Sequence, residues 1–312
     1  MIAIGFDQVE LVIGYFSVHL DNFKTQIKES LEELMGEELH AAQKEYIQLI
    51  VANLSTILKG KPHSLMRLKN MFDNIIDPVI MADEANEDFR SKLLKCMGYS
   101  KRRSDFYPKY FNKLGLKVCV YCNAQLAVSV EIEEDSFLAK FQVDHYIPKS
   151  NYPCFSISLF NLYPSCSSCN NSKSQKEVQF ELYKKFPENS SAFNFSLDMI
   201  SVVDYFISHD HEDLKFKFNE PKLNNGYHSF ESVFNISSIY ATQMDVVEEL
   251  VRKAQVYTEE YKDQLKREFP EIFTTPGMIN RLLVGNYVDQ EFIHKRPLSK
   301  FMIDICKEVG LI

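Results

Sequence analysis

Two short cysteine pairs, CVYC at residues 119–122 and CSSC at residues 166–169, are the most informative stretches of this chain. Each Cys-x-x-Cys pair forms a tight turn that points both sulfurs at one ion. Four thiolates arranged in this way are the ligand set of a tetrahedral structural zinc. The sequence therefore predicts one zinc ion near the middle of the chain. Its expected ligands are Cys119, Cys122, Cys166 and Cys169.

The segment that this zinc would close carries polar residues suited to a second, catalytic metal. Asp144 offers an anionic oxygen and Asn170 a neutral one, and Mg²⁺ prefers oxygen ligands of this kind. His145 follows Asp144 at an expected strand end, so its side chain should point to the opposite face and take a proton from an attacking water. Lys173 lies three residues after Asn170 on one expected helix face, where it can meet a phosphate oxygen. These parts predict phosphodiester hydrolysis.

The composition is that of an ordinary globular protein. The chain has 312 residues, of which 45% are hydrophobic and 25% charged, with no low-complexity tract or solenoid repeat. Its first residues carry Asp7 and Glu10 where a secretory signal would be basic, and no apolar run approaches the roughly 20 residues that span a bilayer. We therefore expect a cytoplasmic protein without a membrane segment. The remaining cysteines, expected to be buried and unreactive, are Cys96, Cys154 and Cys306.

Charge is distributed unevenly along the chain. The net charge of −8 is unusual for a protein that handles nucleic acid, but residues 99–185 hold 12 lysines and arginines against 8 acidic residues and are net +4. Residues 1–98 are net −5 and residues 186–312 are net −7. The basic part begins with KRR at residues 101–103, which beside a phosphodiester site favours a contact with the phosphate backbone. The acidic flanks are expected to contact proteins, in a homo-oligomer or with a partner.

The hydrophobic periodicity predicts an α+β fold that is mainly helical, with a small nuclease core at its centre. Predicted helices cover residues 21–58 (one helix or two), 64–76, 83–97 and 238–269. Predicted strands cover residues 126–132, 141–144, 200–207 and 214–218. A helix from about Ser165 would follow the second strand and carry Asn170 and Lys173. Strand, strand, helix is the order expected for a compact metal-nuclease site.

Three regions are expected along the chain. Residues 1–104 form a helical region, residues 105–190 the nuclease core with its zinc knuckles, and residues 191–312 a C-terminal α+β region with a long helix. Pro276 and Pro297 are expected in the first turns of short closing helices.

Three motifs in the central segment appear in a characteristic order: Asp144-His145-x-x-Pro148-Lys149, Asn161-Leu162-x-Pro164 and Cys166-x-x-Cys169-Asn170-x-x-Lys173. Together they resemble the HNH endonucleases of the ββα-metal type, in the subgroup with a four-cysteine zinc, over about 60 residues. The resemblance implies His145 as general base, Asp144 and Asn170 as ligands of the catalytic metal, and Asn161 as the residue that fixes the His145 loop. The third motif position is asparagine rather than histidine, which favours Mg²⁺ or Mn²⁺ over a softer metal.

Weaker motifs lie further along the chain. They are Asn235-Ile236, Gly285-Asn286-Tyr287 and the run KRPLSK at residues 295–300. They resemble the C-terminal part of bacterial HNH proteins from anti-phage defence operons, such as those of Septu and certain retron systems. This resemblance implies a role in antiviral defence and a partner ATPase.

Two classes of function remain open. One is a metal-dependent endonuclease, and the other is a catalytically inactive module that uses zinc to support nucleic-acid binding or partner docking. A binding module needs only the cysteines, so the presence of every chemical role favours the nuclease. DNA rather than RNA is implied only by the resemblance. The sequence leaves open the number of strands cut and any sequence preference.

Overall fold

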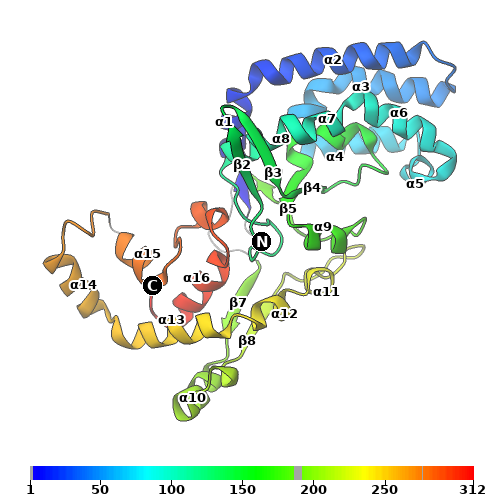
Figure 1. Cartoon of the computed structure of the whole chain (residues 1–312). Coiled ribbons are helices and arrows are strands. Elements are labelled where there is room, and N and C mark those ends of the chain that lie inside the picture. Colours follow the sequence, from blue (N-terminus) through cyan, green and yellow to red (C-terminus); the bar gives the residue numbers. More distant parts are fainter. Residues whose placement is uncertain (1–2, 186–191, 276) are drawn as a thin grey trace.

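The computed structural model describes residues 3–185, 192–275 and 277–312 and has a mainly helical α+β fold, as predicted (Figure 1). Helices follow one another from Phe6 to Leu114 with short connections. Their bounds are α1 (Phe6–Tyr15), α2 (Ser17–Met35), α3 (Ala41–Lys59), α4 (Pro62–Asp73), α5 (Pro78–Ala82), α6 (Glu87–Met97), α7 (Tyr99–Asp105) and α8 (Tyr107–Leu114). The helices predicted in this part are therefore present, and residues 21–58 form two of them.

Local signals explain where these helices begin and end. Helix α3 begins at a capping box, in which the backbone N–H of His40 donates to Gln43 Oε1 at 3.0 Å. It ends before Gly60, and Pro62 occupies the first turn of α4. Gly98 ends α6 in the left-handed conformation with φ of 64°, which a residue without a Cβ adopts readily.

The central segment consists of two antiparallel hairpins and one short helix. Strand β2 (Val128–Glu133) pairs with β3 (Ser136–Lys140), and β4 (Gln142–His145) pairs with β5 (Leu162–Ser165). The two strands predicted over residues 126–132 and 141–144 therefore do not pair with each other, and each pairs with another strand. The reason is a turn at Asp135, with φ of 60°, that folds β2 back onto the residues just after it. Helix α9 (Ser167–Lys173) follows β5 directly, close to where it was predicted.

The C-terminal part combines one two-stranded sheet with a series of helices. Strand β7 (Asn194–Leu197) pairs antiparallel with β8 (Phe216–Asn219). The helices are α10 (Met199–Ser208), α11 (Phe230–Phe234), α12 (Ile236–Ala241), α13 (Met244–Val256), α14 (Glu259–Glu268), α15 (Met278–Val284) and α16 (Ser299–Glu308), with a 3₁₀ turn over Gln290–Lys295.

The predicted strand over residues 200–207 is wrong, because these residues form helix α10. The side chain of Asp198 caps this helix by accepting the N–H of Ile200 at 3.0 Å. Val202 and Tyr205, three residues apart, form its buried side. The run is rich in β-branched residues, which favour strands, and the cap and this spacing outweigh that preference.

The predicted long helix over residues 238–269 is also interrupted. It is divided among α12, α13 and α14, and the Thr258 hydroxyl caps α14 by accepting the N–H of Tyr261 at 3.3 Å. Pro297 lies just before α16 rather than in its first turn, and Pro276 lies outside the described residues.

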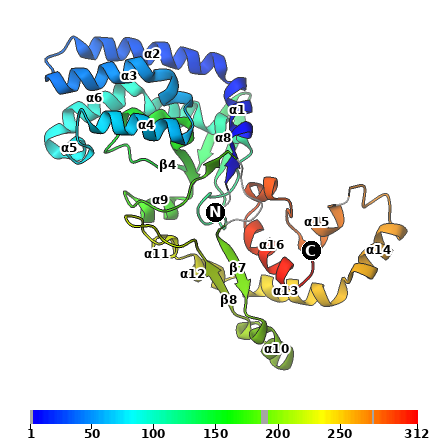
Figure 2. The ribbon, with the colours of Figure 1, turned by 180° about the vertical axis from the view of Figure 1, so that it is seen from behind.

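The N-terminal helices and the C-terminal part lie on two sides of the central segment (Figures 1 and 2). Strand β1 (Ile4–Gly5) pairs in parallel with β6 (Tyr183–Lys184), which joins the start of the chain to the end of the central segment. Most of the buried hydrophobic residues between Ile4 and Leu311 form one connected cluster, so both outer parts pack onto the centre. Among the described residues, no helix has both the length and the apolar character needed to cross a membrane.

Candidate active site and metal centre

The four paired cysteines come together in space. Their sulfur atoms all lie within 4.8 Å of one another, and all four residues are buried. Four sulfurs at about 2.3 Å from one Zn²⁺ form a tetrahedron of similar size, so this donor set fits the predicted ion. In the part of the chain that the structure describes, all the cysteines are free thiols, and these four form the one group of three or more His, Cys, Asp or Glu side chains placed to hold a metal ion.

The two cysteine pairs reach this cluster from different local structures. Cys119 and Cys122 lie in the turn after α8, where the N–H of Asn123 donates to the carbonyl of Cys119 at 2.9 Å. Cys166 is the N-cap of α9, and its sulfur accepts the N–H of Cys169 at 3.5 Å. Burial raises the pKa of the Cys119 thiol, and a bound cation would offset that cost by favouring the thiolate.

Asp144 is buried at the middle of β4 between two donors. The Tyr121 hydroxyl donates to Asp144 Oδ2 at 2.5 Å, and Lys173 Nζ lies 3.0 Å from the same oxygen. Burial raises the pKa of the Asp144 carboxyl, and the Lys173 ammonium and the Tyr121 hydroxyl oppose that rise. Tyr121 and Lys173 thus both contact Oδ2, one of the two oxygens of this carboxylate.

His145 ends β4 with its ring buried. Its Nε2 lies 3.0 Å from the carbonyl oxygen of Ser156, and because a carbonyl can only accept, Nε2 carries the hydrogen and Nδ1 has the free lone pair. Burial, followed by repulsion from Lys149, lowers the pKa of His145 to about 3. The imidazole is therefore neutral at physiological pH. Its ring also packs against the Tyr99 ring, with centroids 4.8 Å apart.

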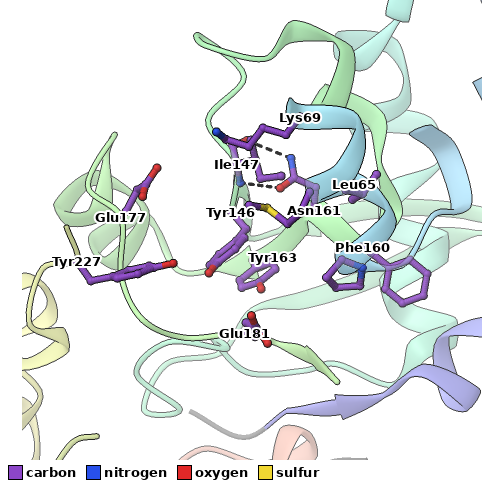
Figure 3. Close-up of a pocket in the computed structure, with 12 residues that line it drawn as sticks. Leu65, Lys69, Tyr146, Ile147, Phe160, Asn161, Tyr163, Glu177, Glu181 and Tyr227 are labelled. Carbon is purple, nitrogen blue, oxygen red and sulfur yellow. Dashed lines mark hydrogen bonds between the residues drawn. The ribbon is translucent and has the colours of Figure 1, made fainter. Parts of the chain in front are cut away.

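Asn161 holds the loop that follows His145. Its Oδ1 accepts the N–H of Ile147 at 2.6 Å, and its Nδ2 donates to the carbonyl of Ile147 at 3.1 Å (Figure 3). Its Nδ2 also donates to the carbonyl of Phe155 at 3.1 Å. Its own carbonyl accepts the N–H of Tyr146 at 3.0 Å. The side chain is almost fully buried, so these bonds do not compete with bulk water.

Lys173 lies beneath the site rather than at its open surface. Only 1% of its side chain is exposed, and Nζ donates to the carbonyl of His145 at 3.1 Å in addition to its ion pair with Asp144. The sequence led us to expect this ammonium to reach a phosphate oxygen. Its observed contacts instead connect α9 to Asp144 and His145, the two predicted site residues of β4.

Asp144, His145 and Asn170 line one cavity of about 300 Å³. The first two come from β4 and the third from α9. Because side chains alternate along a strand, Asp144 and His145 were expected on opposite faces. His145 is the last residue of β4, and both residues line the same cavity. The structure therefore brings together the proposed base and both proposed metal ligands.

Two lining or supporting residues, Tyr121 and Tyr99, were not identified from the sequence as parts of the site. Tyr121 lies between Cys119 and Cys122, and its hydroxyl contacts Asp144. Tyr99 lies between His145 and Lys149, whose Nζ is 4.5 Å from the centroid of the Tyr99 ring. Their only sequence signal would have been proximity to the motifs, which for Tyr99 is absent.

The basic run at residues 101–103 divides into two environments. Arg103 is exposed and lines the cavity, where its Nη2 donates to Gln142 Oε1 at 2.5 Å. Arg102 is buried, donates to the carbonyl of Met97 at 2.6 Å and packs over the Phe23 ring. Only part of the run can therefore contact a substrate in this cavity.

Comparison with known proteins agrees with this geometry. Residues 119–176 match the family model described as HNH endonuclease. The chain contains an HNH domain. The matched residues span the four-cysteine cluster and the Asp144, His145, Asn161 and Asn170 positions. This HNH domain covers less than a fifth of the 312 residues.

One curated relative is the Septu protein PtuB of Bacillus thuringiensis. It is 34% identical over 84 residues, which make up 25% of this chain and 30% of the relative. The chain thus matches less than a third of the length of that relative. No solved structure matches the chain significantly.

Proposed function

We propose that this chain is a metal-dependent endonuclease that hydrolyses phosphodiester bonds of DNA. The supporting observation is the cavity in which the neutral imidazole of His145, the carboxylate of Asp144 and the amide of Asn170 meet. A module that only bound nucleic acid would need the cysteine cluster but not this buried arrangement of a base and two oxygen ligands.

His145 is the proposed general base. The Ser156 carbonyl fixes the tautomer, so Nδ1 is the atom that accepts a proton from an attacking water. Because the His145 pKa is lowered to about 3, the ring is not already protonated at the pH of the cell. Asn161 supports this role by holding the backbone two residues further along.

Asp144 and Asn170 are the proposed ligands of Mg²⁺ or Mn²⁺. A carboxylate and an amide oxygen are a hard donor set that leaves most coordination positions to water and phosphate, as Mg²⁺ prefers. When bound, such an ion neutralises charge on the scissile phosphate and the leaving oxygen. Lys173 and Tyr121 orient Asp144 through Oδ2.

Arg103 and Lys149 are the proposed phosphate contacts of the cavity. Both side chains are exposed and both residues line it. Burial lowers the pKa of Lys149, followed by repulsion from Arg103, and a phosphate between the two cations would relieve that repulsion.

A role in antiviral defence rests on the relative named above and on the resemblance of the C-terminal motifs. We propose that the protein acts in the cytoplasm with a partner ATPase encoded beside it, and that the acidic outer parts provide the protein contacts, with the partner or in a homo-oligomer.

The test is the cleavage of plasmid DNA with Mg²⁺ or Mn²⁺, with and without proteins encoded nearby. His145→Ala should lower the cleavage rate by on the order of 10²–10⁴ while zinc content and DNA affinity stay near wild type, because a base acts in the transition state. Asp144→Ala should lose activity together with metal affinity, and added Mn²⁺ should restore part of it.

A matched control is His209→Ala, which changes an exposed histidine in the C-terminal part. It should cleave at the wild-type rate. If His145→Ala did so too under the same metal concentrations, the catalytic assignment would be wrong and the binding-module function would replace it.

A further inference from the structure

Outside the HNH domain, three cations gather on two aromatic rings between α15 and α16. The guanidinium carbons of Arg281 and Arg296 lie 4.2 Å and 5.3 Å from the centroid of the Tyr287 ring. Lys295 Nζ lies 5.6 Å from the same centroid and 4.0 Å from that of Phe292. The two rings themselves are 5.4 Å apart. We refer to these five residues as the cation–aromatic cluster.

The cluster is a basic island in an acidic part of the chain. Residues 277–300 contain four lysines and arginines against two acidic residues, whereas residues 186–312 are net −7. The fourth cation, Lys300, is already paired with Asp304. Among the described residues, none of the three cluster cations forms an ion pair with a carboxylate, and the nearby Asp289 and Glu291 are exposed.

Contacts with the rings stabilise each cation singly but do not neutralise it. A cation over a ring face gains about 0.5–1 kcal/mol at an exposed site, while three like charges around the same two rings repel one another. Arg296 uses Nη1 to donate to the carbonyl of Gly285 at 3.2 Å, and a guanidinium has further N–H donors in its plane. The arrangement therefore favours the binding of an anion. Several cations side by side fit a ligand that carries negative charges at regular intervals.

The cluster is also fixed to the nuclease core. The buried Asn123, next to the zinc ligand Cys122, donates through Nδ2 to the carbonyl of Ile293 at 3.3 Å and accepts the N–H of Lys300 at 3.0 Å. Its carbonyl accepts the N–H of Leu298 at 2.7 Å. These bonds hold residues 293–300 against the first zinc knuckle. The position of the cluster relative to the active cavity is thereby set by the fold.

We propose that the cation–aromatic cluster binds the phosphate backbone of a nucleic acid at a second contact, outside the catalytic cavity. Cations cover the ring faces, so the contact is with phosphates and not by stacking of bases. The motif Gly285-Asn286-Tyr287 and the run KRPLSK at residues 295–300 come together in space, and the catalytic site uses neither of them. A nucleic-acid binding site gives both a common role. Its use in positioning a substrate rests on the nuclease function proposed above, but the binding itself does not.

The test measures binding of a fluorescein-labelled DNA duplex to the full chain in the His145→Ala background without added divalent metal. The variant Arg281→Gln/Lys295→Gln/Arg296→Gln should bind roughly tenfold or more weakly at moderate salt. The slope of log affinity against log salt should fall by about two to three units, because each lost phosphate contact removes about one. The matched control, Lys24→Gln/Lys28→Gln/Lys44→Gln, removes the same charge from exposed positions of α2 and α3 and should leave the slope near its starting value.

Two further variants separate binding from packing. Arg281→Lys/Arg296→Lys keeps the charge and should keep most of the salt slope. If the triple variant does not fold, as judged by zinc content and thermal unfolding, the exposed Arg296→Gln alone should lower the slope by about one.

An unchanged slope in a folded triple variant, or an equal change in the control, would overturn the proposed binding site. The outcome for the nuclease is separate. If the protein binds DNA through the cluster but never cleaves it, the proposed nuclease function is wrong and the proposed binding site stands. If the protein cleaves DNA but the triple substitution leaves its DNA binding unchanged, the proposed binding site is wrong and the nuclease function stands.

Discussion

At the scale of single residues, Asp144 is held by side chains from two different parts of the chain, Tyr121 and Lys173. One oxygen meets a tyrosine hydroxyl and a buried lysine, and Asp144 lines the same cavity as His145, the proposed base. Lys173 in turn contacts both Asp144 and the backbone of His145. The ionisation of the proposed metal ligand is therefore set by side chains that a substrate does not touch.

Tyr121→Phe tests this dependence. Loss of the hydroxyl removes a donor that opposes the burial of Asp144, so the pKa of that carboxyl should rise further and its ionised fraction should fall. We expect the metal concentration needed for half-maximal cleavage to rise, and the maximal rate to return at saturating metal. A metal titration of the cleavage rate measures both quantities.

Tyr183→Phe is the matched control, because it deletes a buried hydroxyl that donates to the carbonyl of Leu162 at 2.7 Å, away from any carboxylate. Both variants should lose about 1–3 kcal/mol of stability. An equal shift of metal dependence in the two variants would show that Tyr121 acts only through stability.

At the scale of elements, the two cysteine pairs connect short strands and a short helix of the central segment. Helix α9 has seven residues, and β4 and β5 contain four residues each. Elements of this size are marginal by themselves, so their geometry depends on packing from both sides and would depend also on a zinc ion bound by the cysteine cluster.

Cys119→Ser should therefore abolish zinc binding and unfold the central segment. Elemental analysis should find about one zinc per wild-type chain and much less in the variant. Hydrogen exchange should show loss of protection over residues 119–176. Cys96→Ser, at a half-buried cysteine outside the cluster, should keep its zinc. A folded Cys119→Ser protein with a full complement of zinc would contradict the four-cysteine site.

How far the sequence predicts these elements depends on how local the determining physics is. The cysteine pairs and the polar residues of β4 and α9 were predictable because ligand chemistry demands those residue types at those spacings. The partners of β2 and β4 were not, since pairing depends on a turn at Asp135 and on the loop between β4 and β5. The strand predicted over residues 200–207 was wrong because this run of β-branched residues is capped and packed as a helix. The burial of Lys173 was equally invisible, because only the tertiary fold places Asp144 beside it.

At the scale of the whole molecule, the two outer parts hold the HNH domain between them. The aromatic rings of Phe6, Phe160 and Tyr183 form a continuous contact from α1 into the core, with edge-on pairs at 5.6 Å and 5.4 Å. Strand β1 adds its pairing with β6 beside them.

Ile4→Ala tests the contribution of this joint. The side chain is 3% exposed and belongs to the connected core, so its truncation should cost about 2–5 kcal/mol of unfolding free energy. Ile80→Ala, at a position that is 56% exposed, should cost much less. Urea unfolding of the two variants measures the difference. Equal midpoints would mean that the chain start contributes nothing to the stability of the core.

The pairing of Ile4 with Tyr183 also sets an order of events during protein synthesis. The partner of β1 is made about 180 residues after it, which at 5–20 residues per second is on the order of ten seconds or more. Helices α2 and α3 contact each other and can form in that interval, but Ile4 and Phe6 have no strand or ring to pack against. Ile4 therefore gains its strand partner only after both cysteine pairs have been made.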